Sequence, residues 1–493
     1  MGPTESRAAA EPYAQVHETH TGIVVLVDQL AYKGKKPIKT DFLDFRTPRR
    51  RAQALGRELE LNRRLAPASY LGVAQLSMPW NDAAEPVLVM RRHPDSSRLA
   101  TLVRDRRPVT DALLAIADVL ARFHDSAARS RSVASQGKVR AVKARWQANI
   151  AELRHYPGTV VDHRRLDTVE RLAVQFISGR AVLFSGRIAD GRVVDGHGDL
   201  LADDIFCLPQ GPEILDCLEF DDQLRYVDTI DDVAFLAMDL EFLGRKDLAD
   251  FFLEHYSKLA ADPAPRSLKD FYIAYRALVR AKVDCVRFTQ GHRDAVEDAS
   301  RHLDIALEHL RSCSVRVAMV GGGPGTGKST LARGLADLVG ASVISTDEVR
   351  KDMLASGTIG GAPGVLDAGL YSADKVAAVY DEVLRRAHLH LASGESVILD
   401  GTWRDPRRRK QVRELASRTH AFGLELRCET AAHAAARRVA ARPAGHVSDA
   451  TPGIARALAD YGDWSQAHPI DTSRSPSESA RAAADLWRRA VQA

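Results

Sequence analysis

The chain has 493 residues, of which 45% are hydrophobic and 27% are charged, and its formal net charge is +4. This length exceeds what one hydrophobic core usually covers, so we expect about two to four domains. The mild charge gives no reason to invoke nucleic acid as a partner. The five cysteines are odd in number and form no CxxC pair, which argues against a disulfide framework and against a zinc site. No apolar run reaches the length of a membrane span and the first residues lack an apolar signal core, so we expect a cytoplasmic protein without a membrane partner.

The first hundred residues predict a short tail followed by a β-rich lobe. Residues 1–14 are small and polar, which is typical of a disordered tail. Alternating apolar residues from Val16 to Lys33 predict a hairpin of strands. A helical pattern then runs from Arg49 to Leu65, and more β-type sequence comes at Val87 to Met90. We therefore expect residues 15–95 to form one small lobe.

The next two hundred residues are mainly helical in pattern. Helical patterns cover 109–128, 139–153 and 164–179, and after a glycine-punctuated, strand-rich island at 193–206 they resume from about 230 to 313. We expect residues 96–313 to form a second, helical lobe. A small β-rich lobe followed by a larger helical lobe is the layout of a bilobal kinase-like module.

The strand-rich island carries acids at the spacing of a kinase catalytic loop. It reads His197-Gly198-Asp199, with Asp204 five residues after Asp199, and Asp216 follows at the end of a second β-type run. In kinase chemistry the HxD aspartate accepts the proton of the acceptor hydroxyl, and the two later residues hold Mg²⁺. These positions predict Asp199 as the catalytic base, with Asp204 and Asp216 as metal ligands.

This half of the chain resembles the aminoglycoside phosphotransferase family. The resemblance rests on HGD, on LDCLEFDD from residue 215, and on the early segments AYKGKKP, FLDF and LNRRLAP, and it covers most of residues 15–312. It implies that Lys33 grips the nucleotide phosphates and that Glu58 is its helix partner. Lys35 and Lys36 are so close to Lys33 that the choice among the three lysines stays open.

One position departs from the family pattern. The family normally carries Asn where this chain has Asp204, and one branch often has His at the place of Leu201. An Asp oxygen can still ligate Mg²⁺, but its charge adds to that of Asp199 and Asp216 and repels a triphosphate. Either an active first module or a catalytically silent sensor is compatible with this change.

A few neighbouring residues have simpler interpretations. Asp231-Asp232 opens a helical pattern, which indicates a preference of the helix N-terminus for negative charge rather than a site. Tyr272, Tyr275 and Arg276 share a helix face and indicate core packing or a contact between lobes.

The strongest motif of the chain begins at residue 322. An apolar run at Val317 to Val320 leads into GGPGTGKST, residues 322–330, and a helical pattern follows to Gly340. This is the complete P-loop pattern in its strand–loop–helix context. Its backbone N–H groups cradle phosphates, Lys328 reaches the β- and γ-phosphates, and the Ser329 hydroxyl holds Mg²⁺. The nucleotide-binding residues expected here are Gly322, Gly323, Pro324, Gly325, Thr326, Gly327, Lys328, Ser329 and Thr330.

Two further strands of this region are predicted to end in acids. Ala341 to Thr346 leads to Asp347, which could take a proton from an acceptor hydroxyl while Arg350 steadies the phosphates or the acceptor. Asp347 as a simple helix N-cap is equally compatible. The apolar strand at 395–401 carries Asp400, which we favour as a Walker B residue for Mg²⁺ over a turn residue.

Arginines are concentrated in the last hundred residues. Arg438 and Arg442 lie four residues apart on a helical segment, and either a phosphate-stabilising lid or ordinary surface charge is open for them. The run RDPRRRK, residues 404–410, is more typical of a solvated helix start, with a phosphate-rich or polynucleotide acceptor as the alternative.

Residues 314–490 resemble the P-loop kinase group of gluconate kinase-like, polynucleotide kinase-like and zeta-toxin-like enzymes. The resemblance rests on GGGPGTGKST, STDEVRKD, VILDGTW and CETAAHAAARRVAARPAGHVSDAT. It implies that Asp347 serves the acceptor hydroxyl and that arginines of the later helix form a lid. We expect residues 314–493 to form one domain with a doubly wound parallel sheet.

The expected fold class is therefore α/β and α+β, a bilobal protein-kinase-like module followed by a P-loop domain. We expect both modules to use ATP and Mg²⁺ to phosphorylate hydroxyl groups of small molecules, with the occupancy of one affecting the other. Two rivals stay open: a silent sensor module that regulates the P-loop kinase, and an ATP-driven switch whose P-loop only hydrolyses ATP. The acceptors, the oligomeric state and the preference for ATP over GTP are not encoded in any motif.

Overall fold

The computed structural model describes residues 13–18, 22–39, 44–78, 81–362, 368–441 and 464–491. Nearly all of the predicted tail, residues 1–14, therefore lies outside the described residues. The chain divides into two compact units, one of residues 1–141, 187–264 and 275–281, the other of residues 142–186, 265–274 and 282–493. Three helices, α5 (Val139–Leu153), α7 (Ala181–Ala189) and α11 (Arg266–Thr289), contribute residues to both units. The predicted division at 15–95, 96–313 and 314–493 stays a prediction.

The first unit begins with an antiparallel sheet of five strands in the order β1-β2-β3-β5-β4. Its elements are β1 (Ala14–Glu18), β2 (Gly22–Val27), β3 (Leu30–Lys35), α1 (Pro48–Asn62), β4 (Tyr70–Met78) and β5 (Asn81–Arg91). Helix α1 packs on β4 and β5, where Leu55, Tyr70 and Leu88 form a buried cluster. The predicted hairpin and helix are confirmed.

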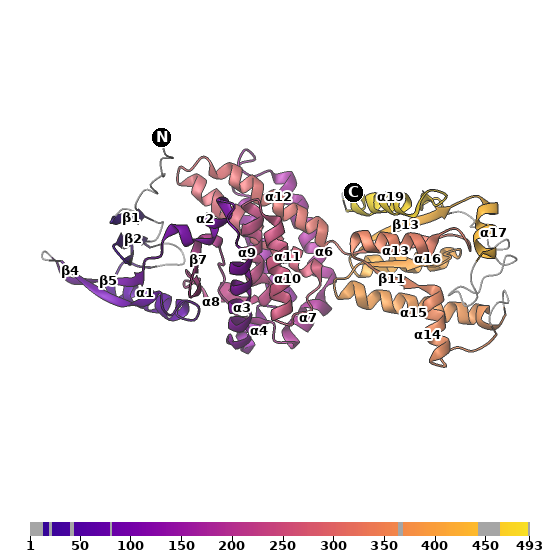
Figure 1. Cartoon of the computed structure of the whole chain (residues 1–493), viewed down its shortest axis with the longest axis horizontal. Coiled ribbons are helices and arrows are strands. Elements are labelled where there is room, and N and C mark those ends of the chain that lie inside the picture. The colour runs from indigo at the N-terminus through magenta and orange to yellow at the C-terminus, as the bar shows by residue number, and fades with distance from the viewer. Residues whose placement is uncertain are drawn as a thin grey trace, which may run out of the picture. The chain divides into compact units, whose positions relative to one another are not determined.

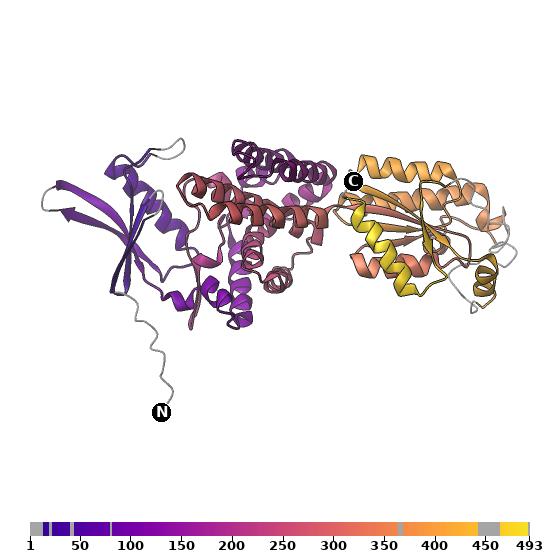
Figure 2. The ribbon, with the colours of Figure 1, turned by 90° about the horizontal axis from the view of Figure 1, so that it is seen from above.

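The rest of the first unit is mainly helical (Figures 1 and 2). Its helices are α2 (Leu99–Arg104), α3 (Thr110–Ser126), α4 (Arg131–Ser135), α8 (Asp222–Arg225), α9 (Thr229–Phe242) and α10 (Lys246–Leu259). Two small antiparallel ribbons frame the HGD loop: β6 (Val193–Asp195) pairs with β9 (Tyr226–Asp228), and β7 (Ile205–Leu208) pairs with β8 (Gly211–Ile214). The β-lobe and helical lobe expected of a kinase-like module are thus present.

The second unit holds a parallel sheet of five strands in the order β11-β12-β10-β13-β14. The strands are β10 (Arg316–Gly321), β11 (Ser342–Ser345), β12 (Val397–Asp400), β13 (Phe422–Glu429) and β14 (His468–Asp471). The helices between and after them are α13 (Lys328–Val339), α14 (Thr346–Ala355), α15 (Ala373–Ala392), α16 (Pro406–Arg418), α17 (Ala432–Ala440) and α19 (Pro476–Arg489). This order confirms the predicted doubly wound sheet.

Successive side chains of the central strand β10 point to opposite faces of this sheet. Ala318 and Val320 of β10 join a core with Leu331 and Leu335 of α13 and with Trp487 of α19. Helices α15 and α16 contact the sheet elsewhere, through β12, β10 and β13 (Figure 1). Because both faces are covered, the strands read as continuous apolar runs in the sequence.

The same unit includes α6 (His163–Gly179) and α12 (Ala295–Cys313). Hydrogen bonds from arginine side chains to backbone carbonyls join the ends of these helices to the C-terminal region. Arg180, which is fully buried, donates a hydrogen bond of 2.8 Å to the carbonyl of Thr419. Arg316, the first residue of β10, donates to the carbonyls of Arg311 and Trp487 at 2.9 and 3.1 Å.

Candidate functional sites

The P-loop joins the buried strand β10 to α13 by a backbone that only glycine accommodates. Gly322 and Gly325 have φ values of 155° and 82°. A Cβ at Gly322 would collide with the Thr326 hydroxyl, and one at Gly325 would collide with the carbonyl of Ala435 in α17. The glycines therefore let the loop fold back on itself and against α17.

The loop ends at the beginning of α13. Gly327 is the N-cap residue with φ 89°, and Lys328 is the first helical residue. No side chain caps this end by a hydrogen bond among the described residues. The first N–H groups of an α-helix have no partner within the helix and carry the positive end of its dipole, so they suit a phosphate. The glycine-rich loop and the helix start expected at residues 322–330 are therefore present, and their binding of a nucleotide stays a prediction.

Asp400 lies beside the P-loop as the last residue of β12. Its neighbours in the sheet register are Val320 of β10 and Ser345 of β11. The side chain is 4% exposed, and its Oδ1 has no hydrogen-bond partner among the described residues. Burial raises the pKa of this carboxyl, and the neighbouring Lys328 and Ser329 oppose the rise. A buried carboxylate oxygen without a partner beside a serine hydroxyl fits a magnesium ion, which prefers oxygen ligands.

Asp347 and Arg350 form a pair at the end of β11. Arg350 donates a hydrogen bond of 2.6 Å to Oδ1 of Asp347, and its guanidinium lies 4.6 Å from the ring centre of Tyr371. The N-cap of α14 is Ser345, so Asp347 lies in the first turn and is not the cap. The structure thus removes the N-cap alternative and leaves a half-exposed carboxylate oriented by a buried arginine.

Arg438 approaches the P-loop from α17. It donates a hydrogen bond of 3.0 Å to the carbonyl of Thr472, whose own hydroxyl donates to the carbonyl of Thr326 at 2.6 Å. A cavity of about 210 Å³ lies here, lined by Gly327, Thr330, Leu331, Arg438, Thr472, Arg474, Pro476 and Ser479. The loop after β14 was not singled out from the sequence, because TSRSP reads as an ordinary turn. Arg442, the other predicted lid arginine, lies outside the described residues.

The basic run at 404–410 belongs mostly to the start of α16. Asp405 caps this helix by accepting from the Arg407 N–H at 2.8 Å, which fits the interpretation as a helix start. Arg408 pairs with Asp381 at 2.6 Å. Arg409 is buried, with its guanidinium 5.1 Å from the ring centre of Trp464. The run is therefore divided between solvent, a surface pair and the core.

In the first unit, two lysines of β3 contact the same buried glutamate. Nζ of Lys33 lies 2.7 Å from Oε1 of Glu58, and Nζ of Lys35 lies 2.8 Å from its Oε2. Lys33 also contacts Asp216 at 2.8 Å, and Lys35 contacts Glu219 at 2.7 Å. Residues i and i+2 of a strand share a face, so Lys33 and Lys35 both turn toward α1.

Lys36 does not belong to this cluster, because it pairs with Glu18, whose side chain is 70% exposed. The geometry therefore favours Lys33, which alone of the three lysines contacts both Glu58 and Asp216.

Asp216 holds a strained backbone conformation at the centre of the site. Its φ is 61°, in a region that residues other than glycine seldom adopt. Its N–H donates a hydrogen bond of 3.2 Å to the Tyr70 hydroxyl. Lys33 is the main cause that holds the pKa of the Asp216 carboxyl below its usual range. Strain of this kind persists where surrounding contacts enforce it, and it is frequent at functional sites.

Asp199 and Asp204 respond to the same surroundings in the opposite direction. Burial raises the pKa of Asp199 to about 6, and Asp216 adds to the rise. Burial likewise raises the pKa of Asp204 well above its usual value, followed by the charges of Asp216 and Asp199. The three predicted acids are thus brought close enough to affect one another. A group of partly buried acids with raised pKa values at two of its three members fits a cation. No set of three or more His, Cys, Asp or Glu side chains in the described ranges forms a complete metal site.

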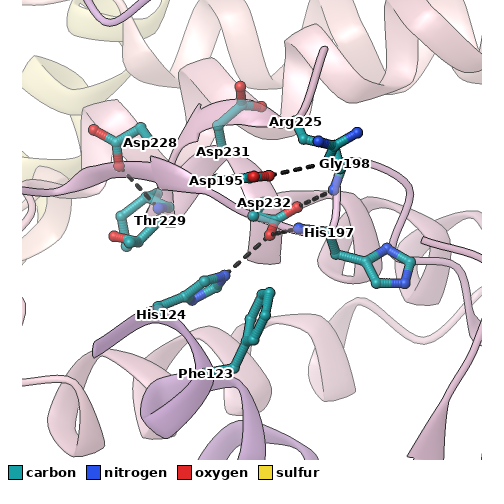
Figure 3. A network of polar contacts seen from close by, with 12 residues as sticks. Phe123, His124, Asp195, His197, Gly198, Arg225, Asp228, Thr229, Asp231 and Asp232 are labelled. Atoms are coloured by element: carbon teal, nitrogen blue, oxygen red, sulfur yellow. Dashed lines mark hydrogen bonds and ion pairs between the residues drawn. The ribbon is translucent and has the colours of Figure 1, made fainter. Parts of the chain in front are cut away.

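A buried network holds the HGD loop in place (Figure 3). Asp232 accepts hydrogen bonds from the backbone N–H groups of His197 and Gly198 at 2.7 and 2.8 Å. The ring Nε2 of His124 lies 3.0 Å from the same carboxylate, and its Nδ1 lies 2.7 Å from the Tyr256 hydroxyl. Although burial opposes it, contacts with His124 and His197 lower the pKa of Asp232.

Asp231 and Asp232 lie in the first turn of α9, as expected, but they do more than complement the helix dipole. Both side chains are fully buried, and Asp231 pairs with Arg276 at 2.7 Å. Arg276 in turn donates to the carbonyl of Gly198 at 3.0 Å, so it supports the loop as well as packing in the core. The sequence did not reveal this role. Asp231 and Asp232 follow the N-cap residue Asp228 in the first turn of α9, where acids commonly occur because they interact favourably with the helix dipole.

Two simpler expectations concern the whole chain. All five cysteines are free, as their spacing indicated. Among the described helices, none combines the length and the apolar character that crossing a bilayer requires.

The parallel sheet and the P-loop indicate the class of the C-terminal region. Residues 317–462 match the protein family described as AAA domain (AAA_33), so this region is a P-loop kinase-type domain. The whole chain is 57% identical over 482 residues to uncharacterized proteins of Mycobacterium bovis and Mycobacterium tuberculosis, covering 98% of this chain and 97% of theirs. The chain belongs to the same family as these mycobacterial proteins.

Solved structures resemble the two regions separately. A gluconokinase from Sinorhizobium meliloti is 18% identical and covers 36% of this chain and 94% of its own, with a TM-score of 0.26. A choline kinase from Cryptosporidium parvum is 10% identical and covers 61% of this chain and 90% of its own, with a TM-score of 0.37.

Proposed function

We propose that the protein is an ATP- and Mg²⁺-dependent phosphotransferase with two modules, each of which phosphorylates a hydroxyl group of a small molecule. The observation that carries the proposal is the arrangement at the end of the P-loop. A helix N-terminus without a side-chain cap, a half-buried lysine and a buried carboxylate oxygen without a partner occur there together. Such a set suits a triphosphate with its metal ion.

In the P-loop module, each residue has a role that follows from its place. Backbone N–H groups of residues 322–330 would bind phosphate oxygens, with Lys328 as the cation that accompanies them. Ser329 and Asp400 would hold Mg²⁺, which neutralises charge on the phosphates. Asp347, oriented by Arg350, would accept the proton of the acceptor hydroxyl, and Arg438 would close over the nucleotide.

In the kinase-like module, Lys33 and Glu58 would position the phosphates, and Asp204 and Asp216 would bind Mg²⁺. Asp199 would take the proton of the acceptor hydroxyl as the new bond forms. In the structure Lys33 contacts Asp216 directly. Binding of a nucleotide with its metal therefore requires these two groups to exchange partners.

The test is a search for phosphorylated products with γ-labelled ATP and a cell extract, repeated with Lys328→Ala, Asp199→Ala and the double variant. We expect each single variant to lose a different labelled product and the double variant to lose both. A protein that consumes ATP but labels no acceptor in any form would contradict the proposal and would favour an ATP-driven switch.

A second candidate is a silent kinase-like sensor that regulates the P-loop kinase. The charge of Asp204 beside two other acids favours it: burial raises the pKa of Asp204 and of Asp199, and the charge of Asp216 adds to both rises. A product that survives Lys328→Ala and disappears with Asp199→Ala would eliminate this candidate. If Asp204→Asn creates a product that the parent chain does not make, the sensor is favoured.

Two further observations concern the acceptor and the compartment of the protein. The neighbouring Asp347–Arg350 pair suits a polar small molecule, and the basic run at 404–410 offers only Arg404, Arg407 and Lys410 to a polynucleotide. Five free cysteines fit a reducing cytoplasm. Supplying 5′-hydroxyl oligonucleotides beside the cell extract would reveal a nucleic acid acceptor.

A further inference from the structure

A cavity of about 210 Å³ lies in the first unit among α3, the start of α9 and the end of α10. No residue that we assign to nucleotide, metal or acceptor lines it. Its volume is below the roughly 300–1,000 Å³ that is common for drug-sized ligands. Any occupant is therefore small.

The charges that line the cavity favour an anion. Three arginines, Arg122, Arg129 and Arg192, stand against two aspartates, Asp118 and Asp125. The side chains of Arg122 and Asp118 pair at 2.7 Å and are 71% and 49% exposed, so this ion pair is weak. The lining thus carries more positive than negative charge.

Two of these arginines also change the character of the nearby helix ends. The C-terminus of a helix normally repels anions, because its last carbonyls carry the negative end of the dipole. Arg129 donates to the carbonyls of His124 and Asp125 at 2.8 Å each, at the end of α3. Arg192 donates to the carbonyls of Ala260 and Ala261 at 3.1 and 2.8 Å, after α10. These hydrogen bonds hold both guanidinium groups at the helix ends, where they offset the negative end of each dipole.

The inner lining connects the cavity to the HGD loop. His124, Thr229 and Tyr256 all line it and are all buried to at least 98%. Tyr256 contacts His124, which contacts Asp232, which accepts from the N–H groups of His197 and Gly198. A ligand against the Tyr256 side chain would touch the first member of a chain of contacts that ends on the loop.

We propose that this cavity binds a small molecule through its phosphate group and that the bound ligand stiffens the HGD loop through Tyr256, His124 and Asp232. Guanidinium groups match the geometry of phosphate oxygens, and a phosphate carries more negative charge than a carboxylate. Free phosphate and a short phosphorylated metabolite share this chemistry.

Binding is measured by calorimetric titration of the full chain carrying Lys328→Ala, so that the P-loop does not dominate the signal. Inorganic phosphate and glycerol 3-phosphate are the two probes, and the one that binds more tightly identifies the source of the phosphate. We expect Arg122→Ala to weaken binding about tenfold, as expected for loss of a charge-assisted hydrogen bond. Arg385→Ala, which breaks a similarly exposed Arg–Glu pair on α15, should leave binding unchanged. Absence of binding by both probes, or equal affinity in Arg122→Ala, would overturn the proposal.

A second variant tests the cavity itself. Ala121→Leu adds bulk to the lining and should abolish binding in a chain whose melting temperature matches that of the parent. Persistent binding in such a chain would place the phosphate elsewhere. Hydrogen exchange of a peptide covering residues 195–203 then tests the link to the loop. Exchange should slow when glycerol 3-phosphate or phosphate binds, and unchanged exchange would contradict the link.

Discussion

The P-loop of the second unit and the lysine–acid cluster of the first unit prepare for phosphate by different means. In the proposed function the P-loop would bind phosphate through backbone N–H groups from consecutive residues, in a loop made possible by glycines with positive φ such as Gly325. The cluster would use side chains from distant segments, since Lys33 and Asp216 are 183 residues apart. The first device depends on a short stretch of sequence and the second on the whole fold around it. Substitutions should therefore act locally in the one and affect stability in the other.

The largest expected effect is on the chemistry of the first module. Asp199→Asn removes the proposed base and should reduce transfer by this module about 10²–10⁴-fold. The rate is measured with γ-labelled ATP in the Lys328→Ala background, so that the P-loop module is silent. Asp203→Asn is the control, because that side chain is about half exposed and pairs with Arg104 at the surface. Equal losses in both variants would contradict the assignment.

For the P-loop module, Lys328→Ala should reduce transfer about 10²–10³-fold, as expected when a preorganised charge at the transferred group is removed. The comparison variant is Lys351→Ala, which lies on the exposed side of α14 in the same domain. The two variants are compared by their initial rates of product formation at saturating ATP. A modest change in Lys328→Ala would show that another cation stabilises the phosphates.

The network beneath the HGD loop predicts a loss of stability rather than of chemistry alone. Asp232→Ala leaves the N–H groups of His197 and Gly198 and the ring of His124 without their buried acceptor. We expect the free energy of unfolding to fall by about 3–5 kcal/mol. Chemical denaturation monitored on the first unit measures this change. Asp118→Ala, at a half-exposed surface pair on α3, should change it by less than about 1 kcal/mol.

Two neighbouring lysines, one at the end of β3 and one directly after it, allow a direct comparison between a buried and a surface ion pair. Lys35→Ala removes a buried partner of Glu58 and Glu219 and should cost about 3 kcal/mol of unfolding free energy. Lys36→Ala removes only a surface pair with Glu18 and should cost less than about 1 kcal/mol. Urea unfolding of both variants side by side measures the difference. If the two losses are equal, Lys35 does not act as a buried member of the cluster.

The smallest effect concerns pH. Because the pKa of Asp199 is raised to about 6, its proton-accepting form decreases about tenfold for each pH unit below 6. The rate of the first module should therefore rise with pH through about 6 and level off above it. A pH profile of single-turnover transfer in the Lys328→Ala background measures the midpoint. A midpoint near 4, the ordinary value for an aspartate, would show that the burial of Asp199 does not persist in the nucleotide complex.

Sequence reasoning succeeded where a feature depends on neighbouring residues. The strand, glycines and helix around Lys328 were predicted as they occur, because phosphate cradles need a contiguous pattern. The order of the kinase-like acids was predicted for a similar reason, since Asp199 and Asp204 belong to one loop. The exclusion of Lys36 required the register of β3 against α1, which the three neighbouring lysines could not reveal.

Sequence reasoning failed where the contact partner of a residue lies far along the chain. Asp232 is separated from His124 by 108 residues, and nothing near it indicates that it accepts backbone N–H groups. The loop at Thr472 contacts the P-loop residue Thr326 across 146 residues, and a polar turn carries no signal for that contact. Such contacts depend on tertiary packing, which local patterns do not encode.

The central claim is that residues 322–330 with Asp400 bind a nucleoside triphosphate and its metal ion. Calorimetric titration with Mg-ATP of the full chain carrying Lys33→Ala, which weakens the first module, tests it most directly. We expect one binding event that disappears when Lys328→Ala is added and weakens when Asp400→Asn is added. Absence of binding in the Lys33→Ala chain, or binding that survives Lys328→Ala unchanged, would contradict the claim.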